Sequence, residues 1–204
     1  KAMKVAVIGA SGRAGSEIVA ELSRRGHQVT GVARHPEKIA SLPGVTAKAG
    51  DVHDKAGLVA LIKGHDAVVS SVMFHASNPD LLIAAVRESG VKRYFVVGGA
   101  GSLEVAPGVR LIDTPQFPEI YKTEASMGAA YLEKLKATTD LDWTFLSPAA
   151  EFVPGERTGK FRLGLDNLIA NDHGSSISFA DYAIAAVDEL ESPKHVRRRF
   201  SIGY

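Results

Sequence analysis

The sequence predicts an α/β protein built on a doubly wound parallel sheet, with helices on both faces and a small C-terminal extension. Short β-branched apolar runs alternate with segments of helical periodicity, which is the pattern of βαβ units. The strand runs are apolar at almost every position, as strands covered on both faces must be. A length of 204 residues with 45% hydrophobic content fits one domain spanning residues 1–204.

The first half of the chain carries the clearest alternation. Each of three apolar runs precedes a segment in which apolar residues recur at helical spacing. These strand and helix pairs are 4–10 with 14–26, 28–34 with 36–42, and 65–72 with 78–90. A further strand is expected to end at Asp51, which makes it the third in chain order.

The second half continues with a strand at 92–101, a long helix from about Pro118 to Thr138 and a strand at 141–152. Residues 153–164 contain Pro and Gly and predict a loop with a short strand. Ser178 and Asp181 form a weak capping-box-like start to a helix within 176–193. We expect residues from about 150 onward to contribute the wall on the substrate side.

The last run, 196–204, is predicted to be a terminal strand at the edge of the sheet. Its residues Arg197, Arg198 and Arg199 resemble a nucleic-acid patch in isolation. Three basic residues on an edge strand are more typical of a solvated edge that blocks aggregation. We therefore expect no nucleic-acid partner.

Composition excludes several classes of protein. The 24 Lys and Arg residues nearly balance 23 Asp and Glu, so no global field attracts nucleic acid or a membrane surface. The chain has no cysteine, and its seven histidines are scattered without metal-ligand spacing, so no metal site is expected. No apolar run approaches the length of a membrane span. A cytoplasmic monomer or homodimer is the expectation.

A glycine-rich turn links the first strand to the first helix. Gly9, Gly12 and Gly15 are spaced three apart in GASGRAG, unlike the commonest dinucleotide fingerprint, but the physical roles are similar. Gly9 permits the tight turn, Gly12 lets amides approach a pyrophosphate, and Gly15 allows close helix packing. The anion then lies at the positive end of the helix. The predicted cofactor-binding residues of this loop are Gly9, Ser11, Gly12, Arg13, Ala14 and Gly15.

The residues after the second strand favour NADP over NAD. An NAD site places an acidic residue there to bind the ribose hydroxyl, whereas this chain reads Val32-Ala33-Arg34-His35. Arg34 and Arg13 offer guanidinium groups suited to the 2′-phosphate. Each is alternatively an ordinary surface arginine. Asp51, with Val52 beside it, is placed to accept from the adenine amino group, or else it is a helix N-terminal acid like Asp54.

With these motifs, the chain resembles the atypical short-chain dehydrogenase/reductases of the NAD(P)H-binding, NmrA-like group. Within that group it is most similar to the small NADH-flavin reductase-like proteins related to biliverdin-IXβ/flavin reductase. The resemblance covers nearly the whole chain and implies a Rossmann-like fold. It rests on VIGASGRAG (7–15), GDVHD (50–54), VVGGAGSL (96–103), LDWTFLSPA (141–149), PGERTG (154–159) and ISFADYAIAAVDE (177–189).

The catalytic signature of the wider superfamily is missing. Its members use Tyr-x-x-x-Lys to protonate a carbonyl oxygen, but Ala125 follows Tyr121 and Leu135 follows Tyr131 at that spacing. Flavins and quinones accept hydride into a delocalised system and need a weaker proton donor. The sequence therefore favours an NADPH-dependent reductase of a flavin, quinone or similar planar acceptor, with FMN or riboflavin as substrate rather than bound cofactor.

The acceptor should lie beyond the carboxyl ends of strands four to six. Ser70 and Ser71 are expected against the ribose and nicotinamide, and Pro148 and Phe152 at the nicotinamide wall. Phe74 either stacks on the acceptor or fills the core, and Arg157 is a candidate ligand for an anionic substrate. The candidate catalytic residues are Ser102, His75 and Tyr121; each has a plain reading as well, as a turn serine, an exposed loop histidine and a pocket-lining tyrosine.

Two other functions compete with the reductase. A non-catalytic redox sensor of the NmrA type would bind NADP(H) and report its ratio through a partner, and the missing relay supports it equally. A sugar-nucleotide epimerase is disfavoured because its keto-intermediate chemistry uses the absent relay. The C-terminal part is also small for a nucleotide-sugar domain.

Overall fold

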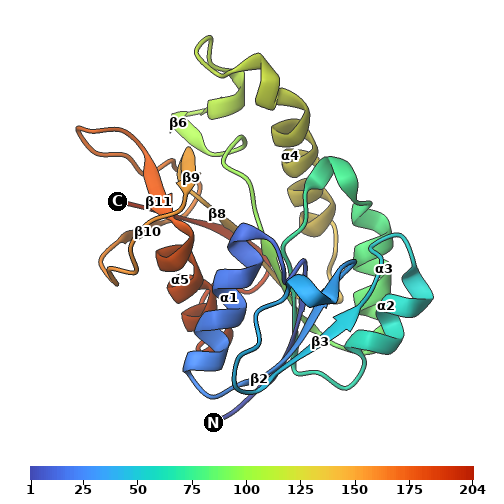
Figure 1. Cartoon of the computed structure of the whole chain (residues 1–204). Helices are drawn as coiled ribbons and strands as arrows, with labels where there is room; N and C mark the ends of the chain where they lie inside the picture. Colours follow the sequence, from blue (N-terminus) through green and yellow to red (C-terminus); the bar gives the residue numbers. More distant parts are fainter.

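Eight strands form the central sheet of the computed structural model, which describes residues 1–204 (Figure 1). The strands are β1 (Lys4–Ile8), β2 (Gln28–Ala33), β3 (Val45–Ala49), β4 (Ala67–Ser70), β5 (Arg93–Val97), β8 (Asp142–Ser147), β10 (Arg162–Gly164) and β12 (Arg198–Gly203). Their order is β10-β12-β8-β5-β4-β1-β2-β3, and all neighbours are parallel except β10 and β12. The direction of winding reverses between β1 and β4, where open sheets of this kind bind ligands.

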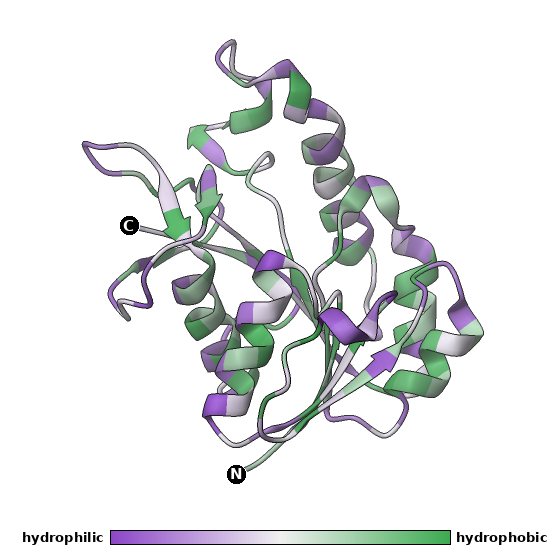
Figure 2. Ribbon diagram, in the orientation of Figure 1, coloured by the Kyte–Doolittle hydropathy of each residue, from purple (hydrophilic) through white to green (hydrophobic).

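Five helices cover the two faces of the sheet. They are α1 (Arg13–Arg24), α2 (Lys55–Ile62), α3 (Pro79–Ser89), α4 (Lys122–Lys136) and α5 (Phe179–Glu191). Helices α1 and α5 pack side by side over one face, around 26 buried residues, while α2, α3 and α4 cover the other around 20 (Figure 1). Hydrophobic residues are concentrated along the central strands between these layers (Figure 2). The helices are too short or too polar to pass through a lipid bilayer.

Smaller elements lie at the ends of the strands. Strand β9 (Glu151–Val153) pairs with β11 (Ser176–Ser178), and β6 (Glu104–Ala106) forms a hairpin with β7 (Val109–Arg110). Four short 3₁₀ turns complete the fold: η1 (Pro36–Lys38), η2 (Phe74–Ala76), η3 (Leu111–Asp113) and η4 (Glu119–Tyr121). The parallel sheet with helices on both faces confirms the predicted fold class.

The segment 36–42 differs from its prediction. Only the single turn η1 forms there, and the chain is extended again at Ile39, whose side chain is buried in the core. Pro43 disfavours helical backbone at the residue before it, which prevents the turn from growing. The chain instead forms α2 after β3, where the carboxylate of Asp54 caps the helix by accepting from the N–H of Gly57 at 3.0 Å.

Strand β12 is interior, so the prediction of a solvated edge strand was wrong. Residues of β10 return antiparallel to β12 and occupy the edge position. Arg198 is exposed, but the side chain of Arg199 is only 5% exposed. Its guanidinium can be buried because the hydroxyls of Ser102 and Ser147 and the carboxylate of Asp166 accept its N–H groups.

Candidate functional site

The glycine turn after β1 lies at the point where the sheet reverses direction. Gly9 has a φ of +85°, and a Cβ built on it would lie 2.0 Å from the carbonyl oxygen of Ser71 at the end of β4. A Cβ on Gly15 would lie 2.0 Å from the carbonyl oxygen of Gly9. These two glycines are therefore required by the packing of the turn against β4 and α1.

Gly12 is different, because no part of the chain requires it to be glycine. Its φ is −75°, and a Cβ there would meet only the carbonyl oxygen of Gly9, at the ordinary contact distance of 3.4 Å. Gly12 is exposed at the N-cap of α1. A side chain at this position would occupy the space directly in front of the helix.

The first turn of α1 presents unpaired donors to that space. Gly12 supplies no side-chain cap, and the backbone N–H groups of Arg13, Ala14 and Gly15 have no acceptor within the chain. The first turn also contains no acidic residue. Unpaired N–H groups and the helix dipole together make this end of α1 suited to an anion. These groups fit the pyrophosphate of a dinucleotide.

Two cations stand beside this helix end. Arg13 begins α1 and Arg34 follows β2 directly; both side chains are exposed and neither has an ion-pair partner in the chain. Asp51 uses one carboxylate oxygen to accept from the N–H of His53 at 2.8 Å. Val52 is partly buried against the core on the side of α2. The edge made by the ends of β1, β2 and β3 is thus basic near Arg34.

Ser70, Ser71 and Pro148 lie at the ends of β4 and β8. Ser70 is 2% exposed, so its hydroxyl offers almost no accessible surface to a ribose. Ser71 contributes the carbonyl that faces Gly9, and Pro148 is buried. Of these three, Ser71 is the one in direct contact with the glycine turn.

His75 is held by a carboxylate from another element. Glu124, in the first turn of α4, accepts from His75 Nδ1 at 2.6 Å and from the backbone N–H of His75 at 2.8 Å. Its other oxygen accepts from the N–H of Phe74 at 2.8 Å. Sequence reasoning missed Glu124, because a contact across 49 residues leaves no periodic signal.

The aromatic candidates divide between core and surface. The ring of Phe74 packs against Tyr131 and Phe145 and fills the core. The ring of Phe152 packs against Phe179 and is only partly buried. Tyr131 is 1% exposed, and burial raises its pKa well above the ordinary range. Tyr121 is 60% exposed, and its hydroxyl has no hydrogen bond in the chain.

Ser102 faces a groove between α4 and the β6–β7 hairpin. Its hydroxyl accepts from Arg199 Nη1 at 2.8 Å, and its carbonyl accepts from Nη2 at 3.2 Å. The groove has a volume of about 280 Å³ and is lined by both acidic and basic residues, among them Glu133 and Lys136. A larger cavity of about 470 Å³ lies near Thr30, at the amino ends of β1 to β3 and opposite the glycine turn. The larger cavity thus lies away from the glycine turn, so cavity volume alone does not identify the candidate cofactor site.

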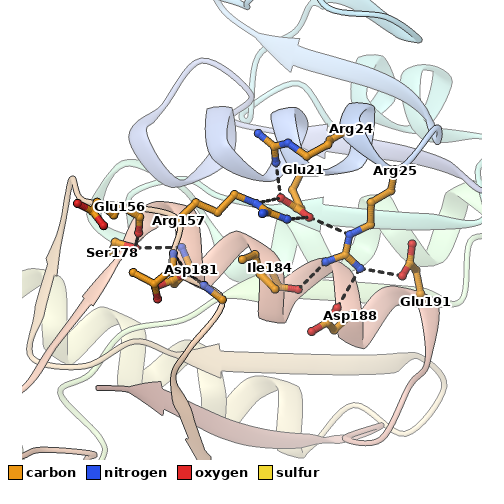
Figure 3. A network of polar contacts seen from close by, with 12 residues as sticks. Glu21, Arg24, Arg25, Glu156, Arg157, Ser178, Asp181, Ile184, Asp188 and Glu191 are labelled. Carbon is orange, nitrogen blue, oxygen red and sulfur yellow. Dashed lines mark hydrogen bonds and ion pairs between the residues drawn. The ribbon is translucent and has the colours of Figure 1, made fainter.

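Arg157 is bound to Glu21 of α1 (Figure 3). Glu21 is 1% exposed and accepts from Arg157 Nε and Nη2 at 2.9 and 3.0 Å, as well as from Arg25 Nε at 2.8 Å and from Arg24. Burial alone would raise the pKa of Glu21, but the hydrogen bonds from Arg157 and Arg25 lower it to about 2. Arg157 is thus paired with Glu21, while its side chain stays 44% exposed.

The same loop is attached to α5 through a second buried carboxylate. Asp181 accepts from the N–H groups of Thr158 and Gly159 at 2.8 and 2.9 Å and from the hydroxyl of Tyr204 at 2.6 Å. Burial opposes ionisation, yet hydrogen bonds from Thr158 and Tyr204 lower the pKa of Asp181. Loop 154–160 is therefore fastened to α1 and α5 together.

Comparison with known proteins agrees with this geometry. Residues 9–193 match the family model described as NAD(P)H-binding. The chain belongs to this NAD(P)H-binding family. The match confirms the resemblance to the atypical short-chain dehydrogenase/reductases, and a nicotinamide cofactor follows from it.

Relatives in this family match the full length of the chain. The uncharacterized protein YwnB of Bacillus subtilis is 44% identical, with 98% of each chain covered. The solved structure of a "putative epimerase" from Bacteroides thetaiotaomicron is 42% identical, with a TM-score of 0.93 over 100% of this chain and 98% of the other. That of a "putative NADH-flavin reductase" from Streptococcus pneumoniae is 39% identical, with a TM-score of 0.82 over 98% and 99%. The comparisons support an oxidoreductase of the reductase type.

Proposed function

We propose that the protein is an NADPH-dependent reductase that transfers hydride to a flavin, a quinone or a similar planar acceptor. The observation that carries the proposal is the set of three unpaired N–H groups on the first turn of α1, next to the unpaired Arg13 and Arg34. Amides at a helix N-terminus suit a pyrophosphate, and two guanidinium groups suit a ribose 2′-phosphate. NADPH carries both groups, and when bound it supplies the hydride.

The chain's own residues would hold the cofactor as follows. The N–H groups of Arg13, Ala14 and Gly15 bind the pyrophosphate, and Gly12 leaves the space for it. Arg34 and Arg13 bind the 2′-phosphate, which an acidic residue after β2 would repel. Asp51 keeps one carboxylate oxygen for the adenine amino group. The chain thus binds and orients the cofactor at the point where the sheet reverses.

The choice of acceptor follows from the missing Tyr-x-x-x-Lys relay. Tyr131 is buried against Tyr94, and Tyr121 is exposed with Ala125, not lysine, four residues later. Reduction of a ketone requires a strong proton donor at the developing alkoxide, whereas a planar conjugated acceptor spreads the charge. Positioning the two reactants together then supplies much of the rate. The name of the Streptococcus pneumoniae relative supports a flavin-type acceptor.

Stopped-flow mixing tests this proposal. NADPH-loaded protein is mixed with FMN, riboflavin and menadione, and oxidation is followed at the nicotinamide absorbance band. We expect at least one acceptor to be reduced faster than in a matched solution without protein. Rates equal to the uncatalysed reaction for all three would refute the reductase.

A redox sensor is the second candidate, because the missing relay fits a protein that binds NADP(H) without turnover. Titration calorimetry with NADPH and with NADP⁺ distinguishes a redox sensor from a reductase. A sensor binds one form much more tightly and shows no turnover of any acceptor.

The name of the Bacteroides thetaiotaomicron relative raises a third activity, epimerisation. Epimerisation is disfavoured for this chain because its keto-intermediate chemistry uses the Tyr-x-x-x-Lys relay, which the chain lacks.

A further inference from the structure

The turn after β4 is fixed from three directions. The ring of Phe74 is 9% exposed and lies 5.7 Å from the ring of Tyr131, and a Cβ on Gly128 of α4 would touch it. Glu124 accepts the backbone N–H groups of Phe74 and His75, and the hydroxyl of Ser77 closes the turn on the carbonyl of Met73 at 2.9 Å. Side chains that project from so constrained a turn are preorganised.

The imidazole of His75 is fixed in the same way. Its Nδ1 lies 2.6 Å from Glu124 Oε1, and an ionised carboxylate can only accept, so Nδ1 carries the proton. Nε2 has no hydrogen-bond partner in the chain, and the side chain is 50% exposed. The ring therefore presents Nε2 to solvent at the same sheet edge as Ser71, whose carbonyl contacts the glycine turn.

From this arrangement we propose that His75 is the proton donor to the acceptor and that Glu124 is its positioning residue. The inference rests on the proposed reductase function. Two-electron reduction of a quinone requires one hydride and one proton, and the proposed function supplies the hydride from NADPH. The protonated imidazole gives up its Nε2 proton, which forms an O–H bond on the reduced quinone. Nε2 then regains a proton from water.

The other two candidate donors are less suited to the role. Arg199 donates to the hydroxyl of Ser102 and holds it in the groove beside α4. The hydroxyl of Tyr121 has no partner that would orient it. His75 alone among the three has a ring oriented by a carboxylate and a second nitrogen with no partner in the chain.

Two acceptors with different proton requirements test the proposal in the full chain. Menadione needs a hydride and a proton, whereas the cation methylene blue becomes its neutral reduced form with a hydride alone. We expect His75→Asn to slow menadione reduction by about 10²-fold, the usual contribution of a general acid, and to change methylene blue reduction by less than about threefold. Equal losses with both acceptors would overturn the role of His75 and leave the reductase standing. No turnover in the wild type would refute the reductase itself.

Glu124→Gln tests the positioning role with a second readout. Long-range proton–nitrogen NMR spectra report which ring nitrogen of His75 is protonated, whether or not the enzyme turns over. We expect the neutral ring to be the Nδ1–H tautomer in the wild type, a smaller share of that tautomer in Glu124→Gln, and no change in Glu133→Gln, whose carboxylate lies exposed on the same helix. An unchanged spectrum in Glu124→Gln would contradict the assignment. Menadione reduction should fall in Glu124→Gln, by less than in His75→Asn.

Discussion

The carboxylate of Glu21 and the guanidinium of Arg157 form a bidentate ion pair, with Nε and Nη2 at 2.9 and 3.0 Å from the two oxygens. Glu21 belongs to α1, the helix that begins at the glycine turn, and Arg157 belongs to the loop after β9. The pair joins the cofactor-binding half of the chain to the segment that we expect to form the substrate-side wall. Arg25 extends the network to Asp188 and Glu191 of α5 (Figure 3).

Removal of Glu21 should destabilise the fold. Glu21→Ala removes the carboxylate that Arg25 and Arg157 share, and because both arginines keep access to solvent the expected cost is that of the lost charged hydrogen bonds, about 1.5–3 kcal/mol. Urea unfolding followed by the fluorescence of the single, buried Trp143 measures the loss. Glu133→Ala, in which the deleted side chain is 72% exposed, is the matched control and should change the free energy of unfolding by less than about 0.5 kcal/mol. Equal changes in the free energy of unfolding for the two substitutions would show that the Glu21 network stabilises the fold no more than an exposed side chain does.

Glu21 should also make stability depend on pH. Its pKa is about 2 in the folded protein and 4.5 when unperturbed, so between these values the unfolded chain binds more protons. The stabilisation is therefore complete above pH 4.5 and is lost as the pH falls toward 2. Asp181, whose pKa is also lowered, adds to the loss in acid. Urea unfolding from pH 6 to pH 3 should give a smaller slope in Glu21→Gln, by up to about 1.4 kcal/mol per pH unit; identical slopes would be inconsistent with a depressed pKa of Glu21.

The three glycines of the turn should respond differently to alanine. Gly9→Ala and Gly15→Ala place a Cβ 2.0 Å from a backbone oxygen and should lower the free energy of unfolding by several kcal/mol. Gly12→Ala should preserve stability and weaken NADPH binding at least about tenfold, the equivalent of ~1.5 kcal/mol for one charged hydrogen bond. Unfolding in urea and titration calorimetry measure the two quantities. Unchanged NADPH affinity in Gly12→Ala would argue against a pyrophosphate at this helix end.

Arg34 should determine the choice between NADPH and NADH. Arg34→Asp removes a cation and adds a charge that repels the 2′-phosphate, so the ratio of the two affinities should shift toward NADH by about 10–100-fold. Arg198→Asp, at an exposed arginine that begins β12, serves as the control and should leave the ratio unchanged. Calorimetry with both cofactors gives the ratios. If Arg34→Asp and Arg198→Asp change the ratio of NADPH to NADH affinity equally, Arg34 does not bind the 2′-phosphate.

Local patterns predicted the fold and the glycine turn because the signals were local. Alternating apolar runs indicated parallel strands, and the spacing of Gly9 and Gly15 indicated their packing roles. The segment 36–42 had helical periodicity but formed one turn: the chain is extended at Ile39, whose side chain is buried, and Pro43 disfavours helical backbone at Leu42. Periodicity indicates which side chains can be buried on one face of a helix. It does not show whether a nearby proline allows the backbone to be helical.

Contacts between distant residues were beyond prediction from one sequence. Glu124 binds His75 across 49 residues, and Arg199 binds Ser102 across 97, so neither pair leaves a periodic trace. The position of β10 beside β12 likewise turned an apparent edge into an interior strand. The sequence therefore supplied the cofactor loop and His75 as one of three candidate catalytic residues, whereas its partner Glu124 came from the structure.

The central claim is that the protein transfers hydride from NADPH to a planar acceptor. Single-turnover reactions with NADPH deuterated on one face or the other of nicotinamide C4, followed by mass analysis of the NADP⁺ formed, test it most directly. Transfer within a binding site predicts that one epimer loses all of its deuterium and the other retains it. Loss of deuterium in the same proportion as in the reaction without protein, or no oxidation while NADPH is bound, would contradict the claim.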